Sequence, residues 1–150
     1  MSKKSGAIAA LIEGCRGREL DAHYLGYFEC FNRQLFFEAH DVLEELWLKD
    51  RTSSNYSFYK GLIQLAGAFV HLQKNRLRPA AALFKLAQAN LQQYPPMFEC
   101  LDVAAVLALI DLWLAASENG GNALNPLDRD APPRLDPPWR GSDGRPATAN

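Results

Sequence analysis

Residues 31–47 read FNRQLFFEAHDVLEELW. Most apolar side chains in this stretch recur at intervals of three and four residues, which is the spacing of one face of an α-helix. One flank of that face carries His40 and Glu44, which are four residues apart and therefore neighbours on a helix surface. An apolar helix rarely holds a histidine and a carboxylate beside its buried face without a partner for them. The stretch therefore predicts a helical fold and marks the place to look for a site.

The same periodicity extends over most of the chain. We expect helices at about residues 5–15, 20–32, 36–48, 56–75, 79–93 and 103–117. Polar or proline-containing segments separate the later helices, among them Lys49–Asn55 and Tyr94–Pro96. No segment alternates as a strand does, and no Asn-Gly or Asp-Gly turn joins two apolar runs. The expected fold is all-α, a single-domain bundle of about five helices with short connections.

The composition changes after residue 122. Residues 123–150 hold six of the nine prolines, so we expect an all-helical domain at residues 1–122 and an irregular, proline-rich tail at residues 123–150. The apolar side chains that could fix parts of this tail to the domain are Leu124, Leu127, Leu135 and Trp139.

Charge and hydropathy exclude several classes of protein. The formal net charge is −1, with 16 basic and 17 acidic residues, so broad attraction to nucleic acid or to an anionic membrane is not expected. The longest apolar stretch, Val103–Ala116, contains Asp111 and is shorter than the roughly 20 residues that span a bilayer. The N-terminal apolar run AIAALI is too short for a secretory leader. These features predict a protein that does not enter membranes.

The cysteines point to a cellular compartment. Cys15, Cys30 and Cys100 are odd in number and widely spaced, and they match neither a zinc site nor a disulfide framework. Reduced thiols are the simplest interpretation, and they predict a cytoplasmic location.

Several stretches together resemble a known family. FNRQLFFEAHDVLEELW, YKGLIQLAGAFVHL, AALFKLAQANLQQYP and LDVAAVL are similar to the bacterial and archaeal family called domain of unknown function 309. The resemblance covers roughly residues 24–113, and its most specific part is Glu38-Ala39-His40 with Glu44 and Trp47. Lys60 departs from the family pattern, in which glutamine is common before the glycine. The resemblance implies a small all-helical protein and no established activity, substrate or cofactor.

A helical wheel separates the positions of the quoted stretch. The core face centres on Ala39, and the flank beside it holds His40 and Trp47. Glu44 lies just beyond that flank, whereas Asp41 points away from the core. Among the acidic side chains, Glu44 is therefore the one best placed to act with His40. Phe37 lies opposite the core face, so it should meet another element or a partner.

The expected helix at 56–75 offers a complementary stripe. Lys60, Gln64, Gly67 and His71 share one line beside its apolar face. Because Gly67 has no side chain, another helix can approach closely there. If the flank of His40 packs against this stripe, His40, Glu44, Gln64 and His71 converge, with Trp47 shielding them.

Three interpretations of this cluster remain open. In the structural one, Glu44 only satisfies His40 within the helix. In the binding one, the five side chains His40, Glu44, Trp47, Gln64 and His71 line a site for a partner protein or small ligand. In the third, His40, Glu44 and His71 hold Zn²⁺ or Fe²⁺, or His40 and Glu44 act as a general base.

No complete catalytic or cofactor motif accompanies the cluster, such as His-Glu-x-x-His or a glycine-rich phosphate loop. We therefore predict no cofactor. The hypothesis that we favour from the sequence is a non-catalytic helical module that binds a partner or ligand around His40 and Glu44. The alternative is a metal-dependent or general-base enzyme that uses His40, Glu44 and His71.

Overall fold

The computed structural model describes residues 19–49, 51–118, 125–129 and 131–138. Its long helices are α2 (Ala22–Asn32), α3 (Phe36–Lys49), α4 (Tyr56–Gln73), α5 (Leu77–Leu91) and α6 (Val103–Glu118). Each lies within two residues of its predicted bounds, and the all-α class is confirmed. The helix predicted at residues 5–15 lies outside the described residues. No helix in the described part of the chain is both long and apolar enough to cross a bilayer.

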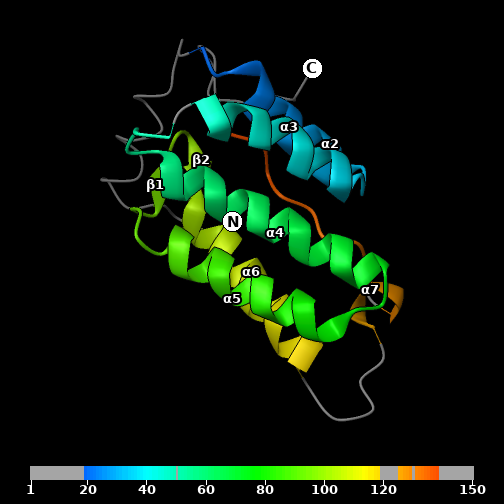
Figure 1. Ribbon diagram of the computed structural model, residues 1–150. Helices are drawn as coiled ribbons and strands as arrows, with labels where there is room; N and C mark the ends of the chain where they lie inside the picture. Colours follow the sequence, from blue (N-terminus) through cyan, green and yellow to red (C-terminus); the bar gives the residue numbers. More distant parts are fainter. Residues whose placement is uncertain (1–18, 50, 119–124, 130, 139–150) are drawn as a thin grey trace.

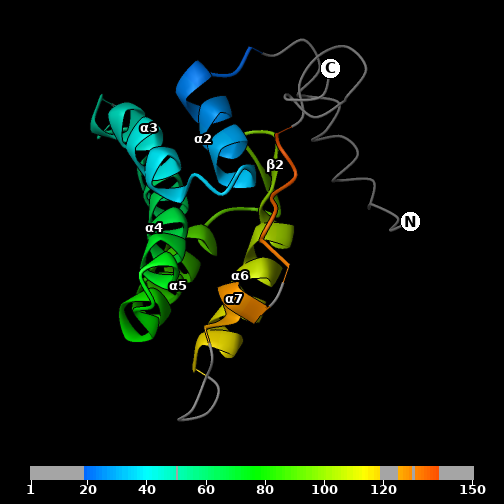
Figure 2. The ribbon, with the colours of Figure 1, turned by 90° about the vertical axis from the view of Figure 1, so that its right-hand side faces the viewer.

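The helices form two layers. Figure 1 shows α3, α4 and α5 side by side in the front layer, with α4 in the middle. Figure 2, turned by 90°, shows α2 and α6 behind them, with the orange segment that follows α7 running up along α6 towards α2. Consecutive helices contact one another from α2 to α6. The bundle therefore has α4 at its centre.

The ring of Phe69 on α4 is the meeting point of the core. It is fully buried, and an aromatic ring from each of the other four long helices packs against it. The distances between ring centroids are 5.5 Å to Phe31, 5.0 Å to Phe36, 5.2 Å to Phe84 and 5.0 Å to Trp113. Aromatic pairs at this spacing add stability beyond the burial of their area, so Phe69 holds both layers together.

Two tight turns connect helix pairs in the same way. At the end of α2, the Leu35 N–H donates to the Cys30 carbonyl at 2.9 Å and the Gln34 N–H donates to the Phe31 carbonyl at 2.9 Å. This is a Schellman motif, and it places Gln34 in the left-handed conformation with φ 64°. The turn after α4 repeats the pattern with Asn75 at φ 58°. Both turns direct the next helix back along its predecessor.

A short hairpin corrects the prediction that the chain contains no strands. Strands β1 (Met97–Phe98) and β2 (Leu101–Asp102) pair antiparallel. Between them, Glu99 and Cys100 have φ values of 47° and 61°, as in the two-residue turn that matches the twist of a hairpin. Neither residue is the glycine or asparagine that usually signals such a turn. The Tyr24 hydroxyl donates to the Glu99 carbonyl at 2.8 Å and ties the hairpin to α2.

The cysteines differ from one another. Cys100 is disulfide-bonded, so the prediction of reduced thiols is wrong for this residue. Cys30 is free and half-buried, and burial, together with the nearby carboxylates of Glu38 and Glu29, raises the pKa of its thiol. A raised pKa leaves little reactive thiolate at neutral pH.

Part of the proline-rich tail is anchored to the bundle. Pro126–Arg129 forms one helical turn, α7, in a stretch predicted to be irregular. The Asn125 side chain begins this turn by accepting from the Leu127 N–H at 3.0 Å, and it donates to the Leu72 carbonyl at the end of α4. Further on, Leu135 is buried with 3% of its surface exposed. Leu127 packs against the core, whereas Leu124 and Trp139 lie outside the described residues.

Candidate functional site

His40 lies on the side of α3 that faces α4. Its ring atom Cδ2 lies 3.9 Å from the position that a Cβ on Gly67 would occupy, and Leu83 of α5 approaches the same position to 3.3 Å. Gly67 therefore allows three helices to meet at one point. The side chain of His40 is 32% exposed, so one edge of the imidazole rests on α4 while the rest remains accessible to solvent.

The partner of His40 differs from the one expected. The ring atom Nδ1 lies 3.1 Å from Oδ1 of Asp41, within hydrogen-bond distance, whereas the sequence predicted a bond to Glu44. Asp41 is exposed, as the wheel predicted, but its carboxylate also bends back to the ring of the adjacent His40. Glu44 is nevertheless close: the ligand atoms of His40, Asp41 and Glu44 all lie within 4.8 Å of one another.

The two predicted residues of α4 have separate surroundings. Oε1 of Gln64 accepts a hydrogen bond of 2.7 Å from Nδ2 of Asn90, which directs this amide towards α5. Nδ1 of His71 is buried and has no hydrogen-bond partner among the described residues. His71 does not belong to the group of close ligand atoms around His40. The structure thus brings Asp41 to His40 and Glu44 in the place where we expected His71.

The pKa of His71 is lowered. Burial is the main cause, and the positive charges of Arg76 and Lys74 at the following turn add to it. Both effects disfavour the imidazolium form, so His71 is neutral at pH 7.

Trp47, the fifth residue of the predicted cluster, packs where α3 ends and α4 begins. Its ring packs on that of Tyr56, with centroids 5.1 Å apart, and joins the end of α3 to the start of α4. Nε1 of Trp47 is buried without a hydrogen-bond partner within the described part of the chain. Trp47 therefore packs between the two helices while His40 and Glu44 remain partly accessible.

The outward surface of α3 carries a second feature. Phe37, Asp41, Glu44 and Leu48 follow one another at the spacing of one helix face, and we call this set the α3 stripe. Phe37 is 59% exposed and Leu48 is 48% exposed, while the two carboxylates lie between them. Leu48 follows Phe37 by about eleven steps of roughly 1.5 Å along the helix, so the two side chains are about 16 Å apart. The wheel identified Phe37 as an outward residue, but nothing in the sequence distinguished Leu48.

The part of the chain that matches a known family contains the α3 stripe. Residues 24–91 match the model of the family described as domain of unknown function 309, which confirms the resemblance seen in the sequence. The match runs from α2 to the end of α5, and it stops before residue 113, to which we expected the resemblance to extend. No curated protein and no solved structure matches the chain.

Proposed function

We propose that this protein, with its domain of unknown function at residues 24–91, is a non-catalytic helical module that binds a partner protein through the α3 stripe. The observation that supports this proposal is the exposure of Phe37 and Leu48 on either side of the polar centre. Large apolar side chains that bracket a polar cluster are typical of contact residues, because a partner removes their surface from water.

The shape of the surface favours a protein partner. A stripe along the outside of a helix is convex, whereas sites for small molecules are concave. The carboxylates of Asp41 and Glu44 give the centre of the stripe a negative charge, and Glu38 on the same helix adds to it. A fitting partner presents two apolar side chains about 16 Å apart with a basic side chain between them.

Comparative affinity capture tests this proposal. The full chain and its Phe37→Ala and Leu48→Ala variants are immobilised and exposed to lysate of the source organism. The matched control is Leu86→Ala, which removes an exposed leucine (50%) from α5. We expect a captured protein whose recovery falls at least about tenfold with either α3 variant and stays unchanged with the control. Equal recovery with all variants would exclude the α3 stripe as the contact surface.

A divalent metal site is the second candidate, and the close approach of three ligand atoms favours it. One imidazole nitrogen and two carboxylate oxygens suit Zn²⁺ or Fe²⁺, and three protein ligands leave further positions open. Titration of the full chain with Zn²⁺ in a calorimeter tests it, with His40→Ala and Asp41→Asn as disabling variants and Glu38→Gln as control. Binding of one ion that only the first two variants abolish would support the site, and heat that all proteins share would reject it.

The cytoplasmic location stays a prediction. The free thiol of Cys30 agrees with it, but the disulfide bond of Cys100 does not, because reducing compartments rarely preserve disulfides. Rapid alkylation of the protein in cells, followed by mass measurement, distinguishes a reducing compartment from an oxidising one. Alkylation of all three cysteines would support the cytoplasm, and protection of Cys100 would contradict it.

A further inference from the structure

Residues 131–138 lie in the back layer as an extended segment between α2 and α6 (Figure 2). Burial alternates from residue 132 to residue 137: Pro133, Leu135 and Pro137 are buried, whereas Pro132, Arg134 and Asp136 are exposed, and the alternation ends at Pro138, which is also buried. A period of two is the signature of an extended chain with one face against a surface. The bundle therefore holds this segment as a groove holds a bound peptide.

The side chain of Asn32, at the end of α2, binds the backbone of the segment. Its Nδ2 donates to the Leu135 carbonyl at 2.8 Å, and its Oδ1 accepts from the Leu135 N–H at 2.7 Å. A single amide thus satisfies both backbone groups of one residue, as a neighbouring strand would. Because the segment contributes only backbone atoms to these bonds, another extended segment can form them equally well.

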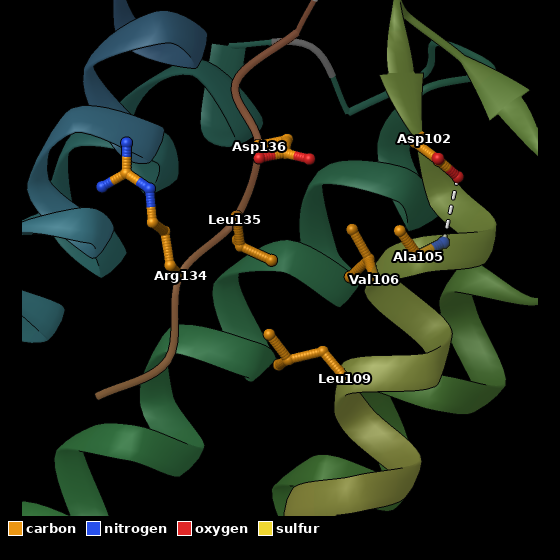
Figure 3. A pocket seen from close by; sticks show the side chains of 7 residues that line it. All are labelled: Asp102, Ala105, Val106, Leu109, Arg134, Leu135 and Asp136. Carbon is orange, nitrogen blue, oxygen red and sulfur yellow. Dashed lines mark hydrogen bonds between the residues drawn. The ribbon is translucent and has the colours of Figure 1, made fainter. Parts of the chain in front are cut away.

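The groove buries an apolar side chain at this position. The side chain of Leu135 points towards Val106 and Leu109 of α6 in Figure 3. The three residues line the same small cavity, of about 90 Å³, with Asp102 and Asp136 at its polar edge. Leu135 is 3% exposed, so the apolar surface that it covers would otherwise face water.

The segment does not fill the groove. A cavity of about 440 Å³ lies where Ala131, Pro132 and Pro133 pass over the second half of α6, and its other walls are Leu112, Trp113 and Ala116. The lining is almost entirely apolar. The methyl group of Ala131 is small for this space, and a large apolar side chain at that position would bury surface that the chain's own segment leaves open.

We propose that the groove between α2 and α6 is a binding site for an extended peptide segment of a partner protein, with the pattern large apolar-x-Pro-x-Leu. Residues 131–138 occupy the groove as an internal competitor that lacks the large apolar residue. The attachment of this segment gives it an effective concentration in the millimolar range. A partner displaces it by filling the 440 Å³ cavity in addition to the leucine position. This groove is separate from the α3 stripe, which lies in the other layer.

Peptide binding to the full chain tests the proposal. The probes are the fluorescent peptide APPRLDPP, which copies residues 131–138, and the same peptide with phenylalanine in the first position. Leu135→Asp removes the internal competitor, and Leu135→Ala serves the same purpose if the first variant fails to fold. Asn32→Ala, added to the folded Leu135 variant, removes the backbone contacts, and Gln92→Ala at the end of α5 is its control.

We expect the Leu135 variant to bind either peptide at least about tenfold more tightly than the natural chain does, and the phenylalanine peptide to bind about tenfold more tightly than APPRLDPP. Asn32→Ala should remove most of this gain, and Gln92→Ala none of it. No binding to a folded Leu135 variant would overturn the proposal. Equal affinity of both peptides, or insensitivity to Asn32→Ala, would overturn it as well. Dimers of the natural chain that Leu135→Ala dissociates would show that the occupant is a second copy, and would also reject a foreign partner.

Discussion

Two glycines of α4 should respond in opposite ways to the same substitution. A Cβ on Gly61 would lie 2.7 Å from Cγ and 3.0 Å from Cδ2 of Leu91, and 3.2 Å from Cβ of Asn90. Leu91 is fully buried, so it cannot move away without displacing the core. Overpacking of this kind costs about 1–3 kcal/mol, and the gain of about 1 kcal/mol in helix propensity offsets only part of it. We expect Gly61→Ala to lower the free energy of unfolding by up to about 2 kcal/mol.

Gly67→Ala is the matched comparison. The nearest atom to its Cβ would be Cδ1 of Leu83 at 3.3 Å, and Leu83 is only partly buried, so it can rotate by the few tenths of an ångström required. The gain in helix propensity then prevails, and the free energy of unfolding should stay equal or rise by up to about 1 kcal/mol. His40, at 3.9 Å, keeps an ordinary contact.

Urea unfolding followed by circular dichroism measures both variants on the full chain. Equal slopes against urea concentration show that the compactness of the two end states is unchanged, so that the midpoints can be compared. If Gly61→Ala proves as stable as Gly67→Ala, the close approach of α4 and α5 at Leu91 is not the reason for a glycine at position 61. The packing argument would then fail.

Three further predictions concern stability. Phe69→Ala should lower the free energy of unfolding by about 3–5 kcal/mol, measured by the same urea method, because the cavity would touch a ring from every long helix; a loss below about 1 kcal/mol would contradict its central place. Gln34→Gly should raise the free energy of unfolding by about 1 kcal/mol, because glycine adopts φ 64° without strain. The gain should appear as a higher melting temperature. The pKa of His71 in the folded protein lies below its ordinary value of 6.5, so the unfolded chain binds the proton more tightly. The free energy of unfolding should therefore fall as the pH drops from above 6.5 through the lowered pKa. His71→Gln should reduce this loss, and melting curves that keep the same pH dependence in both proteins would contradict it.

The helices follow from local patterns. Spacing of apolar residues at three and four positions marks the buried side of each helix, so the bounds of α2 to α6 and the exposure of Phe37 could be predicted. The hairpin at residues 97–102 could not, because Glu99 and Cys100 are not the residues that favour positive φ. The wheel assigned Asp41 to solvent correctly, but it treats side chains as fixed directions and so could not predict the contact of Asp41 with His40. In the structure, that carboxylate bends back to Nδ1 of His40.

The all-α class, the extent of each long helix and the family resemblance, which the match over residues 24–91 confirmed, could all be predicted from the order of residues alone. These depend on neighbours along the chain, which share one helix and therefore one repeat. Two contacts become visible only in the folded chain: Phe69 packs against a ring from each of the other four long helices, and Asn32 binds Leu135 across 103 residues. Such contacts join segments whose own patterns carry no information about each other. Their positions follow from how amphipathic helices and an extended segment bury their apolar surfaces together.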